Sequence, residues 1–308
     1  MNYRNQHVGV LLGGHNAEHE VSLRTGAALA KALRGRGYRV TEVPVEADLP
    51  ETLRRQGIEV AVLGVHGRFF EDGCLQGLLE IMRIPYTGSG VLASALAMDK
   101  VAAKKVFREG HLPVAEEVVV EPARAESFEP SSIPFPFPVV VKPAREGSSV
   151  GVSMVAEPAG LREALRLAAR YAGDILIERR IFGREMNIAV LDGEPLGVLE
   201  VVPGEDFYSY QAKYQSQGRT RYLFPAPVEK PVEARLRELA AEAHRRLGCS
   251  GVSRVEILLD RQGGMFLLEV NTLPGMTEAS LVPKIAAGAG LSFEDLAERI
   301  LAGARLQA

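Results

Sequence analysis

Four polar side chains near the C-terminal end of the chain have the types and spacing of a Mg²⁺ site. Arg254 and Glu256 lie two residues apart in a strand-like stretch, and Glu269 and Asn271 do so after the turn at 260–264. Because strand side chains alternate between faces, a hairpin would bring all four together. Carboxylate and amide oxygens are ligands that Mg²⁺ takes together with phosphates and water. The alternative is a surface hairpin with a solvated charged face.

Strict alternation also sorts the apolar side chains of the second strand. It predicts that Leu267 shares the face of Glu269. On the opposite face it places three apolar side chains, Phe266, Leu268 and Val270. The hairpin would then have one polar face for ligands and one apolar face for the core.

A loop rich in glycine and serine follows a run of three valines. The segment VVVKPAREGSSVG at 139–151 predicts a strand, a loop and a second strand, with Lys142 ending the first strand. Backbone N–H groups of such a loop can close over phosphates, and a lysine beside it supplies a positive charge. The Walker A pattern is missing. Taken alone, the segment could equally be an ordinary turn.

Two polar loops follow predicted strands near the N-terminus. HNAEHEVS at 15–22 stands at a strand-to-helix junction, where open α/β sheets bind ligands, and HGRFFEDG at 66–73 follows another strand. The pattern G-x-G-x-x-G is absent after Gly14, which excludes a dinucleotide-binding motif. The alternative is that both are ordinary polar turns, and Glu71 and Asp72 are typical of such turns.

The elements that would position these residues follow from hydrophobic periodicity. Strands at 8–12, 38–43 and 60–65 alternate with helices, so the first ninety or so residues predict a small open α/β sheet. Residues 94–106 are a helix-forming stretch with Asp99 and Lys100 inside it. The long polar loop at 203–221 is typical of a lid, although its aromatic segment FYSYQAKY at 207–214 could instead bind a partner.

Composition narrows the class of protein. A chain of 308 residues with 46% hydrophobic and 24% charged residues suggests two or three globular domains. A net charge of −3 gives no reason to expect nucleic acid or an acidic membrane as a partner. Cys74 and Cys249 are too few for a disulfide framework. There is no apolar run of membrane-spanning length and no signal-peptide pattern, so we expect a cytoplasmic protein.

Six segments together resemble the D-alanine–D-alanine ligases of the ATP-grasp superfamily. They occur in the family's order and cover nearly the whole chain: LLGGHNAEHEVSL at 11–23, VHGRFFEDGCLQGLLE at 65–80, PYTGSGVLASALAMDK at 85–100, VVVKPAREGSSVGVS at 139–153, FYSYQAKY at 207–214 and LLEVNTLPGMTEASLVPK at 267–284. The resemblance implies a fold of mixed α/β and α+β class. A small open α/β domain at 1–95 would precede a two-lobed ATP-grasp fold at 96–181 and 182–308, with the lid loop in the second lobe.

The activity implied by the resemblance is ATP-dependent ligation of two D-alanines to D-alanyl-D-alanine through a D-alanyl phosphate, for peptidoglycan precursor synthesis. The implied cofactors are two Mg²⁺ ions, for which Mn²⁺ can substitute, with ATP as co-substrate. The implied assembly is a homodimer. Two alternatives are a D-alanine–D-lactate ligase and a nucleotide-binding protein without ligase activity.

The resemblance also implies roles for individual residues. Seven would bind ATP: Lys100, Lys142 and Lys213 at the phosphates, Glu178, Arg179 and Ile181 at the adenine, and Glu185 at the ribose. Three would bind metal: Glu256, Glu269 and Asn271. The sequence departs from the family at Glu256, where family members carry Asp.

The remaining implied residues contact D-alanine or the reacting atoms. Glu18 would bind the ammonium of the first D-alanine, Ser148 and Tyr214 would join Glu18 in one hydrogen-bonded group, and His66 would lie near that substrate. Arg254 and the Gly275 N–H would form an oxyanion hole, and Ser280 and Leu281 would contact the second D-alanine carboxylate. Relatives that make D-alanyl-D-lactate lack a tyrosine at position 214, so Tyr214 favours an amine as second substrate.

Overall fold

The computed structural model describes residues 3–204 and 220–307. Its N-terminal part is a parallel sheet in the order β2–β1–β3. The elements are β1 (His7–Leu12), α1 (His19–Gly35), β2 (Arg39–Pro44), α2 (Leu49–Gln56), β3 (Val60–Leu63) and α3 (Cys74–Met82). Val8 and Val10 pack in one core with α1, whereas Leu11 packs in another with α2 and α3. The predicted open α/β sheet is confirmed.

A single helix over 94–106 is not what forms. Instead α4 (Val91–Met98) ends and α5 (Lys100–Glu109) begins at Asp99, whose backbone is extended. The Asp99 side chain accepts hydrogen bonds from the Val101 and Ala102 N–H groups, the contacts of a helix N-cap. The break makes Lys100 the first residue of a new helix, and it was not visible in the helical periodicity of the sequence.

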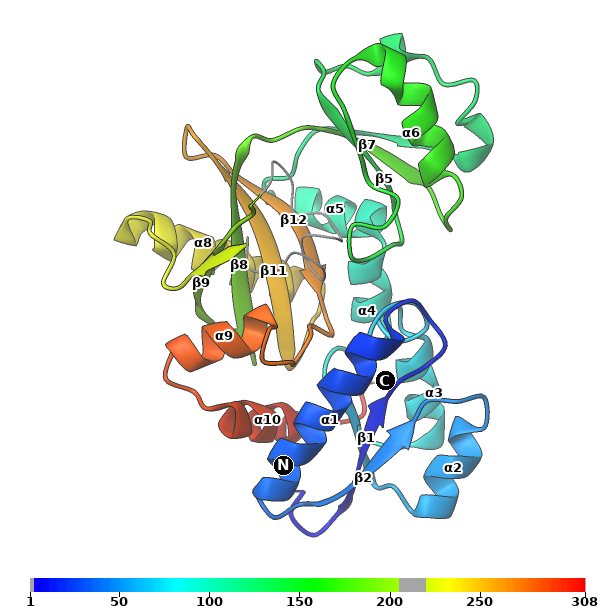
Figure 1. Cartoon of the computed structure of the whole chain (residues 1–308), viewed down its shortest axis with the longest axis vertical. Coiled ribbons are helices and arrows are strands. Elements are labelled where there is room, and N and C mark those ends of the chain that lie inside the picture. The colour runs from blue at the N-terminus through cyan, green and yellow to red at the C-terminus, as the bar shows by residue number, and fades with distance from the viewer. Residues whose placement is uncertain (1–2, 205–219, 308) are drawn as a thin grey trace.

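A four-stranded antiparallel sheet forms the part of the molecule at the top of Figure 1, in the order β4–β7–β5–β6. The elements are β4 (Glu117–Val120), β5 (Val139–Pro143), β6 (Ser153–Val155), α6 (Leu161–Ala168) and β7 (Ile175–Arg179). Helix α6 covers one face, with its apolar side chains packed on the valines of β5. The stretch 121–138 that links β4 to β5 contains two short 3-10 turns, η1 (Pro122–Arg124) and η2 (Pro130–Ser132), and a third, η3 (Pro158–Gly160), precedes α6.

A five-stranded antiparallel sheet in the order β10–β9–β8–β11–β12 completes the fold. Its strands are β8 (Gly183–Leu191), β9 (Glu194–Val202), β10 (Arg221–Leu223), β11 (Val252–Asp260) and β12 (Met265–Asn271), and its helices are α8 (Lys230–Arg246), α9 (Leu281–Gly288) and α10 (Phe293–Ala302). Helix α8 packs on one face of this sheet. Helices α9 and α10 share a core with α1, so the five-stranded and parallel sheets are packed together (Figure 1).

The predicted hairpin is β11 with β12, and its register pairs Arg254 with Asn271 and Glu256 with Glu269. The predicted face of Leu267 was wrong. The register shifts after Glu256, so that Leu267 pairs with Ile257 and is buried in the core under α8. A β-bulge of this kind adds one residue to one strand and ends strict alternation. Leu268, predicted for the core side, lines a cavity together with Glu269.

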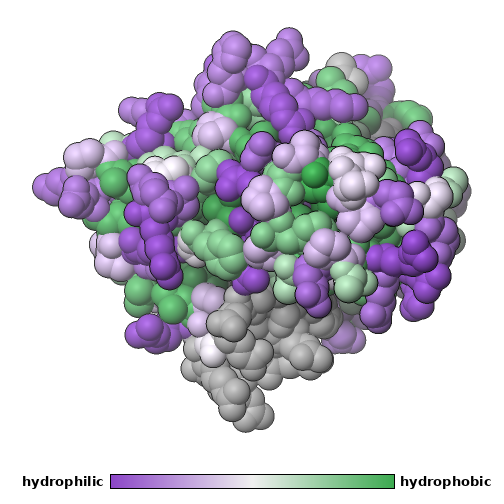
Figure 2. Space-filling model, turned by 90° about the horizontal axis from the view of Figure 1, so that it is seen from above, coloured by the Kyte–Doolittle hydropathy of each residue, from purple (hydrophilic) through white to green (hydrophobic). Residues whose placement is uncertain are grey.

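Seen from above, polar and charged side chains cover most of the protruding surface, and apolar side chains lie in the recesses between them (Figure 2). Among the described residues, no helix is long and apolar enough to cross a membrane. The domain limits at 95 and 181 stay a prediction. Lys213, Tyr214 and the aromatic segment 207–214 lie outside the described residues, and with them most of the predicted lid.

Candidate active site

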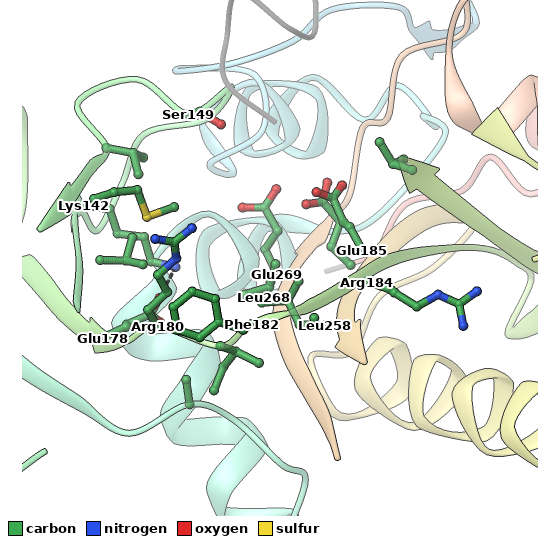
Figure 3. A pocket seen from close by; sticks show the side chains of 18 of the residues that line it. Lys142, Ser149, Glu178, Arg180, Phe182, Arg184, Glu185, Leu258, Leu268 and Glu269 are labelled. Atoms are coloured by element: carbon green, nitrogen blue, oxygen red, sulfur yellow. Dashed lines mark ion pairs between the residues drawn. The ribbon is translucent and has the colours of Figure 1, made fainter. Parts of the chain in front are cut away.

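A cavity of about 840 Å³ lies between the four-stranded and the five-stranded sheet (Figure 3). Strand alternation explains which side chains reach it. On β5, Val139 and Val141 pack in the core, which leaves Val140 and Lys142 for the cavity. On β7, Ile177 packs in the core and Glu178 reaches the cavity.

Six of the seven residues predicted to bind ATP line this cavity: Lys100, Lys142, Glu178, Arg179, Ile181 and Glu185. The seventh, Lys213, lies outside the described residues. Figure 3 shows the carboxylates of Glu185 and Glu269 pointing into the same part of the cavity. Apolar side chains from both sheets, including Met154, Leu258 and Leu268, provide surface for a flat base.

Glu178 is a buried carboxylate held between two lysines. Its Oε1 lies 2.5 Å from the Lys104 Nζ and its Oε2 lies 2.5 Å from the Lys142 Nζ. Burial alone would raise the pKa of Glu178, but the charges of Lys142 and Lys104 outweigh it and lower this pKa to about 2. Glu178 therefore stays ionised at every pH at which the protein would work.

Lys100, the first residue of α5, reaches the opposite wall. Its Nζ donates to the backbone carbonyl of Glu146 at 2.7 Å and lies 3.4 Å from the Glu269 Oε2. Glu146 belongs to the loop between β5 and β6, and burial raises the pKa of its carboxyl. Lys100 thus links the Gly/Ser loop of one sheet to the hairpin of the other.

Of the predicted metal ligands, Glu256 and Glu269 line both of two neighbouring cavities, and Asn271 lines the second. Glu256 is ion-paired with Arg254, and the Asn271 Oδ1 accepts the Leu273 N–H at 2.9 Å. Within 3–204 and 220–307, no three His, Cys, Asp or Glu side chains form a ready metal cluster. A Mg²⁺ ion that accompanies a nucleotide needs only one or two carboxylates, because phosphates and waters fill its other positions. Glu256, Glu269 and the second lone pair of the Asn271 oxygen fit that requirement.

Arg254 lies between these carboxylates. Burial alone would lower its pKa, but the charges of Glu256 and Glu269 outweigh it and raise the pKa above the ordinary value for arginine. Its side chain lines the second cavity. A permanent guanidinium charge there can stabilise an oxyanion.

The second cavity has a volume of about 300 Å³ and lies among the parallel sheet, the Gly/Ser loop and the hairpin. It brings together most of the residues predicted to contact D-alanine: Glu18, His66, Ser148, Arg254, Gly275, Ser280 and Leu281. Tyr214 lies outside the described residues. Asn271, Lys100 and Glu269 also line this cavity.

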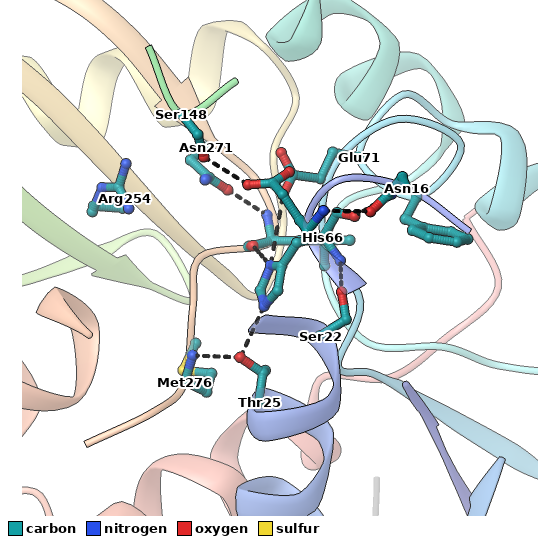
Figure 4. Close-up of polar contacts among 12 residues, drawn as sticks. Asn16, Ser22, Thr25, His66, Glu71, Ser148, Arg254, Asn271 and Met276 are labelled. Atoms are coloured by element: carbon teal, nitrogen blue, oxygen red, sulfur yellow. Dashed lines mark hydrogen bonds and ion pairs between the residues drawn. The ribbon is translucent and has the colours of Figure 1, made fainter. Parts of the chain in front are cut away.

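Glu18 and Ser148 are in direct contact although 130 residues separate them. The Ser148 Oγ donates to the Glu18 Oε1 at 2.7 Å (Figure 4). The other oxygen, Oε2, lies where a side chain at Gly67 would begin, since a Cβ built on Gly67 would come within 2.4 Å of it. The φ of Gly67 is 81°, which favours glycine there, and a side chain at this position would displace the Glu18 carboxylate. The predicted contact between the N-terminal domain and the Gly/Ser loop is formed.

His66 is buried below the second cavity and is fully hydrogen-bonded. Its Nδ1 lies 2.8 Å from the Leu273 carbonyl, which can only accept, so Nδ1 carries the proton. Its Nε2 is hydrogen-bonded to the Thr25 hydroxyl at 2.8 Å, and that hydroxyl accepts the Met276 N–H at 3.2 Å. These contacts connect Thr25 of α1, through His66, to the loop that contains Met276 (Figure 4).

The loop before α9 has its own internal support. The Thr277 N–H donates to the Ser280 Oγ at 3.1 Å, and Ser280 is the residue directly before the first turn of α9. Gly275 lies close to the same hydroxyl, because a Cβ at Gly275 would come within 2.8 Å of it. Gly275, Ser280 and Leu281 therefore face the second cavity as one compact unit.

Sequence reasoning missed two functional candidates. Lys104 holds Glu178, and Glu146 lines both cavities while its carbonyl holds Lys100. For Lys104 a signal existed: it is three residues from Val101 and three from Phe107, on the buried face of α5. A lysine at a core position of an amphipathic helix indicates a buried ion pair.

The cavity between two antiparallel sheets and the parallel sheet beside it define a protein of the ATP-grasp class. A family model described as the D-ala D-ala ligase C-terminus matches residues 107–302. The D-alanine–D-alanine ligase of Anaeromyxobacter sp. (strain Fw109-5) is 55% identical over 98% of this chain and 97% of its own. That of Geobacter sulfurreducens is 52% identical over 97% and 94%.

Solved structures agree. The D-alanine–D-alanine ligase of Bacillus anthracis superimposes with a TM-score of 0.87 at 31% identity, and its complex with ATP with a TM-score of 0.85 at 28% identity. In both comparisons the match covers 97% of each chain. This chain belongs to the D-alanine–D-alanine ligase family. The predicted family, fold class and enzyme class are confirmed.

Proposed function

We propose that this protein joins two D-alanine molecules to D-alanyl-D-alanine, with ATP converted to ADP and phosphate, as a step of peptidoglycan precursor synthesis. The observation that carries the proposal is that the two cavities share part of their lining. Lys100, Glu146, Gly147, Glu256 and Glu269 belong to both. A nucleotide in the larger cavity and an amino acid in the smaller one would meet at these residues.

In the first step, a carboxylate oxygen of the first D-alanine attacks the γ-phosphorus of ATP. The bond to the bridging oxygen breaks, and ADP and D-alanyl phosphate form. Glu18 would hold the ammonium group of that D-alanine, and Lys100 and Lys142 would neutralise phosphoryl charge. Two Mg²⁺ ions held by Glu256, Glu269 and Asn271, with Mn²⁺ as a substitute, would supply further neutralisation of the phosphates.

In the second step, the neutral amine of the second D-alanine attacks the acyl carbon. The tetrahedral oxyanion would lie between Arg254 and the Gly275 N–H. When it collapses, phosphate leaves and takes up the extra proton of the attacking nitrogen. Ser280 and Leu281 would orient the carboxylate of this second substrate. No enzyme nucleophile is required, so the chain acts by positioning and by charge stabilisation.

The acyl phosphate must be kept from water, and the aromatic segment 207–214 with Lys213 and Tyr214 is proposed as the lid that does so. A cytoplasmic location is proposed because ATP is a substrate. We also propose a homodimer. On the adjacent helices α3 and α4, Ile81 is 83% exposed and Leu92 is 71% exposed, and a second copy could cover this apolar surface.

The test is phosphate release from MgATP by the purified protein, with and without D-alanine, and mass spectrometry of the product. Release that rises with D-alanine and yields the dipeptide supports the proposal. A matched reaction with D-lactate as the second substrate tests the rival ligase. Phosphate release that does not depend on D-alanine, in a protein that binds ATP, would refute the proposed reaction.

A further inference from the structure

Lys104 is a buried lysine that does not line the nucleotide cavity. It is 1% exposed, among the most enclosed side chains of the described residues. Its Nζ donates to the Ala115 carbonyl at 3.0 Å and contacts the carboxylates of Glu117 and Glu178. A lysine buried this deeply is unusual unless its charge is needed by a partner.

Of the two carboxylates that Lys104 contacts, Glu178 is the one that lines the nucleotide cavity, and Lys104 and Lys142 divide its two oxygens. Lys104 takes Oε1 and Lys142 takes Oε2, each at 2.5 Å. The lysines approach from different elements, since Lys104 is on α5 and Lys142 is the next-to-last residue of β5. Lys142 faces the cavity and is the lysine proposed to bind a phosphate, whereas Lys104 lies behind Glu178.

This arrangement has a consequence when a nucleotide binds. A phosphate that draws Lys142 away from Glu178 would leave this carboxylate, which is 4% exposed, with one of its two counterions. An unpaired buried carboxylate is strongly disfavoured. Because Lys104 keeps its own oxygen of Glu178, the carboxylate stays paired throughout.

We propose that Lys104 is a positioning residue that keeps Glu178 charged and in place while Lys142 exchanges between Glu178 and a nucleotide phosphate. The inference rests on the proposed function only in placing the nucleotide in the larger cavity. Four charged groups surround Glu178. Lys104 and Lys142 contact it, Glu117 pairs with it on the neighbouring strand β4, and the Arg108 guanidinium lies 2.6 Å from the Glu117 carboxylate. With Lys104 removed, Glu117 keeps Arg108, whereas Glu178 keeps only Lys142.

The test is the affinity for ADP with Mg²⁺, measured by titration calorimetry for wild type and Lys104→Met. The matched control is Lys105→Met, which removes the exposed lysine next along α5. We expect Lys104→Met to lose at least tenfold in ADP affinity at pH 8, and Lys105→Met to stay within twofold of wild type. Lys104→Gln can still donate a hydrogen bond but carries no charge, and it is expected to lose as much ADP affinity as Lys104→Met.

The pH dependence separates this role from a general loss of packing. In Lys104→Met, release of Lys142 leaves Glu178 unpaired, so ADP binding is expected to be coupled to proton uptake by Glu178. The ratio of wild-type to variant affinity should therefore shrink as the pH falls from 8 to 5.5, while titration of ADP itself cancels in the ratio. A ratio that does not change with pH, or an equal loss in Lys105→Met, would overturn the proposal.

Failure of the proposed reaction would look different. A wild-type protein that binds ADP but releases no phosphate with D-alanine refutes the reaction and leaves the lysine comparison intact. A wild-type protein that does not bind ADP refutes both. If the circular dichroism spectrum shows that Lys104→Met is unfolded, the ADP affinity of Lys104→Gln tests the proposed role of Lys104.

Discussion

The hydrogen bond between Ser148 and Glu18 should control the use of D-alanine. It joins the Gly/Ser loop to the N-terminal domain over 2.7 Å, and its acceptor is a partly buried carboxylate. Hydrogen bonds to charged groups contribute about 1.5–3 kcal/mol. Each 1.36 kcal/mol of lost transition-state stabilisation lowers the rate tenfold. Loss of this bond is therefore expected to lower kcat/KM for D-alanine by about 10- to 150-fold.

The backbone of Ser148 sets the choice of variants. Its φ is 52°, in the left-handed region, where an alanine costs about 1–2 kcal/mol and a glycine costs nothing. The wild-type serine already bears this cost, so Ser148→Ala removes the hydroxyl and leaves the backbone strain unchanged, whereas Ser148→Gly also relieves the strain. Both are expected to lose kcat/KM for D-alanine in the assay of phosphate release, and Ser148→Ala is the cleaner measure of the bond.

Ser149 supplies the matched control. Its φ is 60°, but it lines the larger cavity rather than the smaller one. Ser149→Ala is expected to change the KM for ATP more than the KM for D-alanine. The reasoning is refuted if Ser148→Gly stays within threefold of wild type, or if Ser149→Ala loses as much kcat/KM for D-alanine as Ser148→Ala.

Three further outcomes are expected. The pKa of Glu178 is lowered from 4.5 to about 2, so its ionised form contributes about 3 kcal/mol of stability that is present above pH 5 and lost as the pH falls toward 2. Urea denaturation curves of wild type and Glu178→Gln should therefore differ at pH 7 and converge in acid. A difference between the two proteins that is constant with pH contradicts this. Glu269→Gln should abolish D-alanine-dependent phosphate release, whereas Glu256→Asp, which restores the residue of the family, should keep or raise it; the opposite pattern would show that the metal face is wrongly assigned. Asp99→Ala removes the cap of α5 and should lower the free energy of unfolding by about 1 kcal/mol in urea titrations, and an unchanged midpoint would show that the cap is not stabilising.

The hairpin could be predicted from sequence because its pairing is local. A tight turn brings β11 and β12 together, and alternation then fixes which polar side chains share a face. The bulge after Glu256 was not predictable in this way. One extra residue in β12 leaves the apolar pattern intact, because positions 267 and 268 are both leucine and either side chain could face the core.

The buried charges show a different limit. Sequence spacing placed Lys142 at the end of a strand, but it could not show that Glu178 lies diagonally across the sheet from it, since residues 142 and 178 meet only through the pairing of β5 with β7. Lys104 lies on a third element, α5, and its position on the buried face of that helix indicates a buried ion pair but does not show that Glu178 is a partner. Contacts among three elements are set by tertiary packing, which a single sequence does not display.

The ion pairs of the described residues suggest how the site stays folded without substrate. Lys142 pairs with Glu178, Lys100 lies beside Glu269, and Arg254 pairs with Glu256. Each of these three cations thus has an internal carboxylate as its partner. Because a buried unpaired charge is costly, such pairing keeps the cations in place before substrate arrives. A nucleotide that brings both phosphates and metal ions can replace both members of these pairs, with the phosphates meeting the lysines and the metal meeting the carboxylates. The exchange leaves the number of paired charges nearly constant, and it explains why a site rich in charge can be built in the interior of a protein whose net charge is only −3.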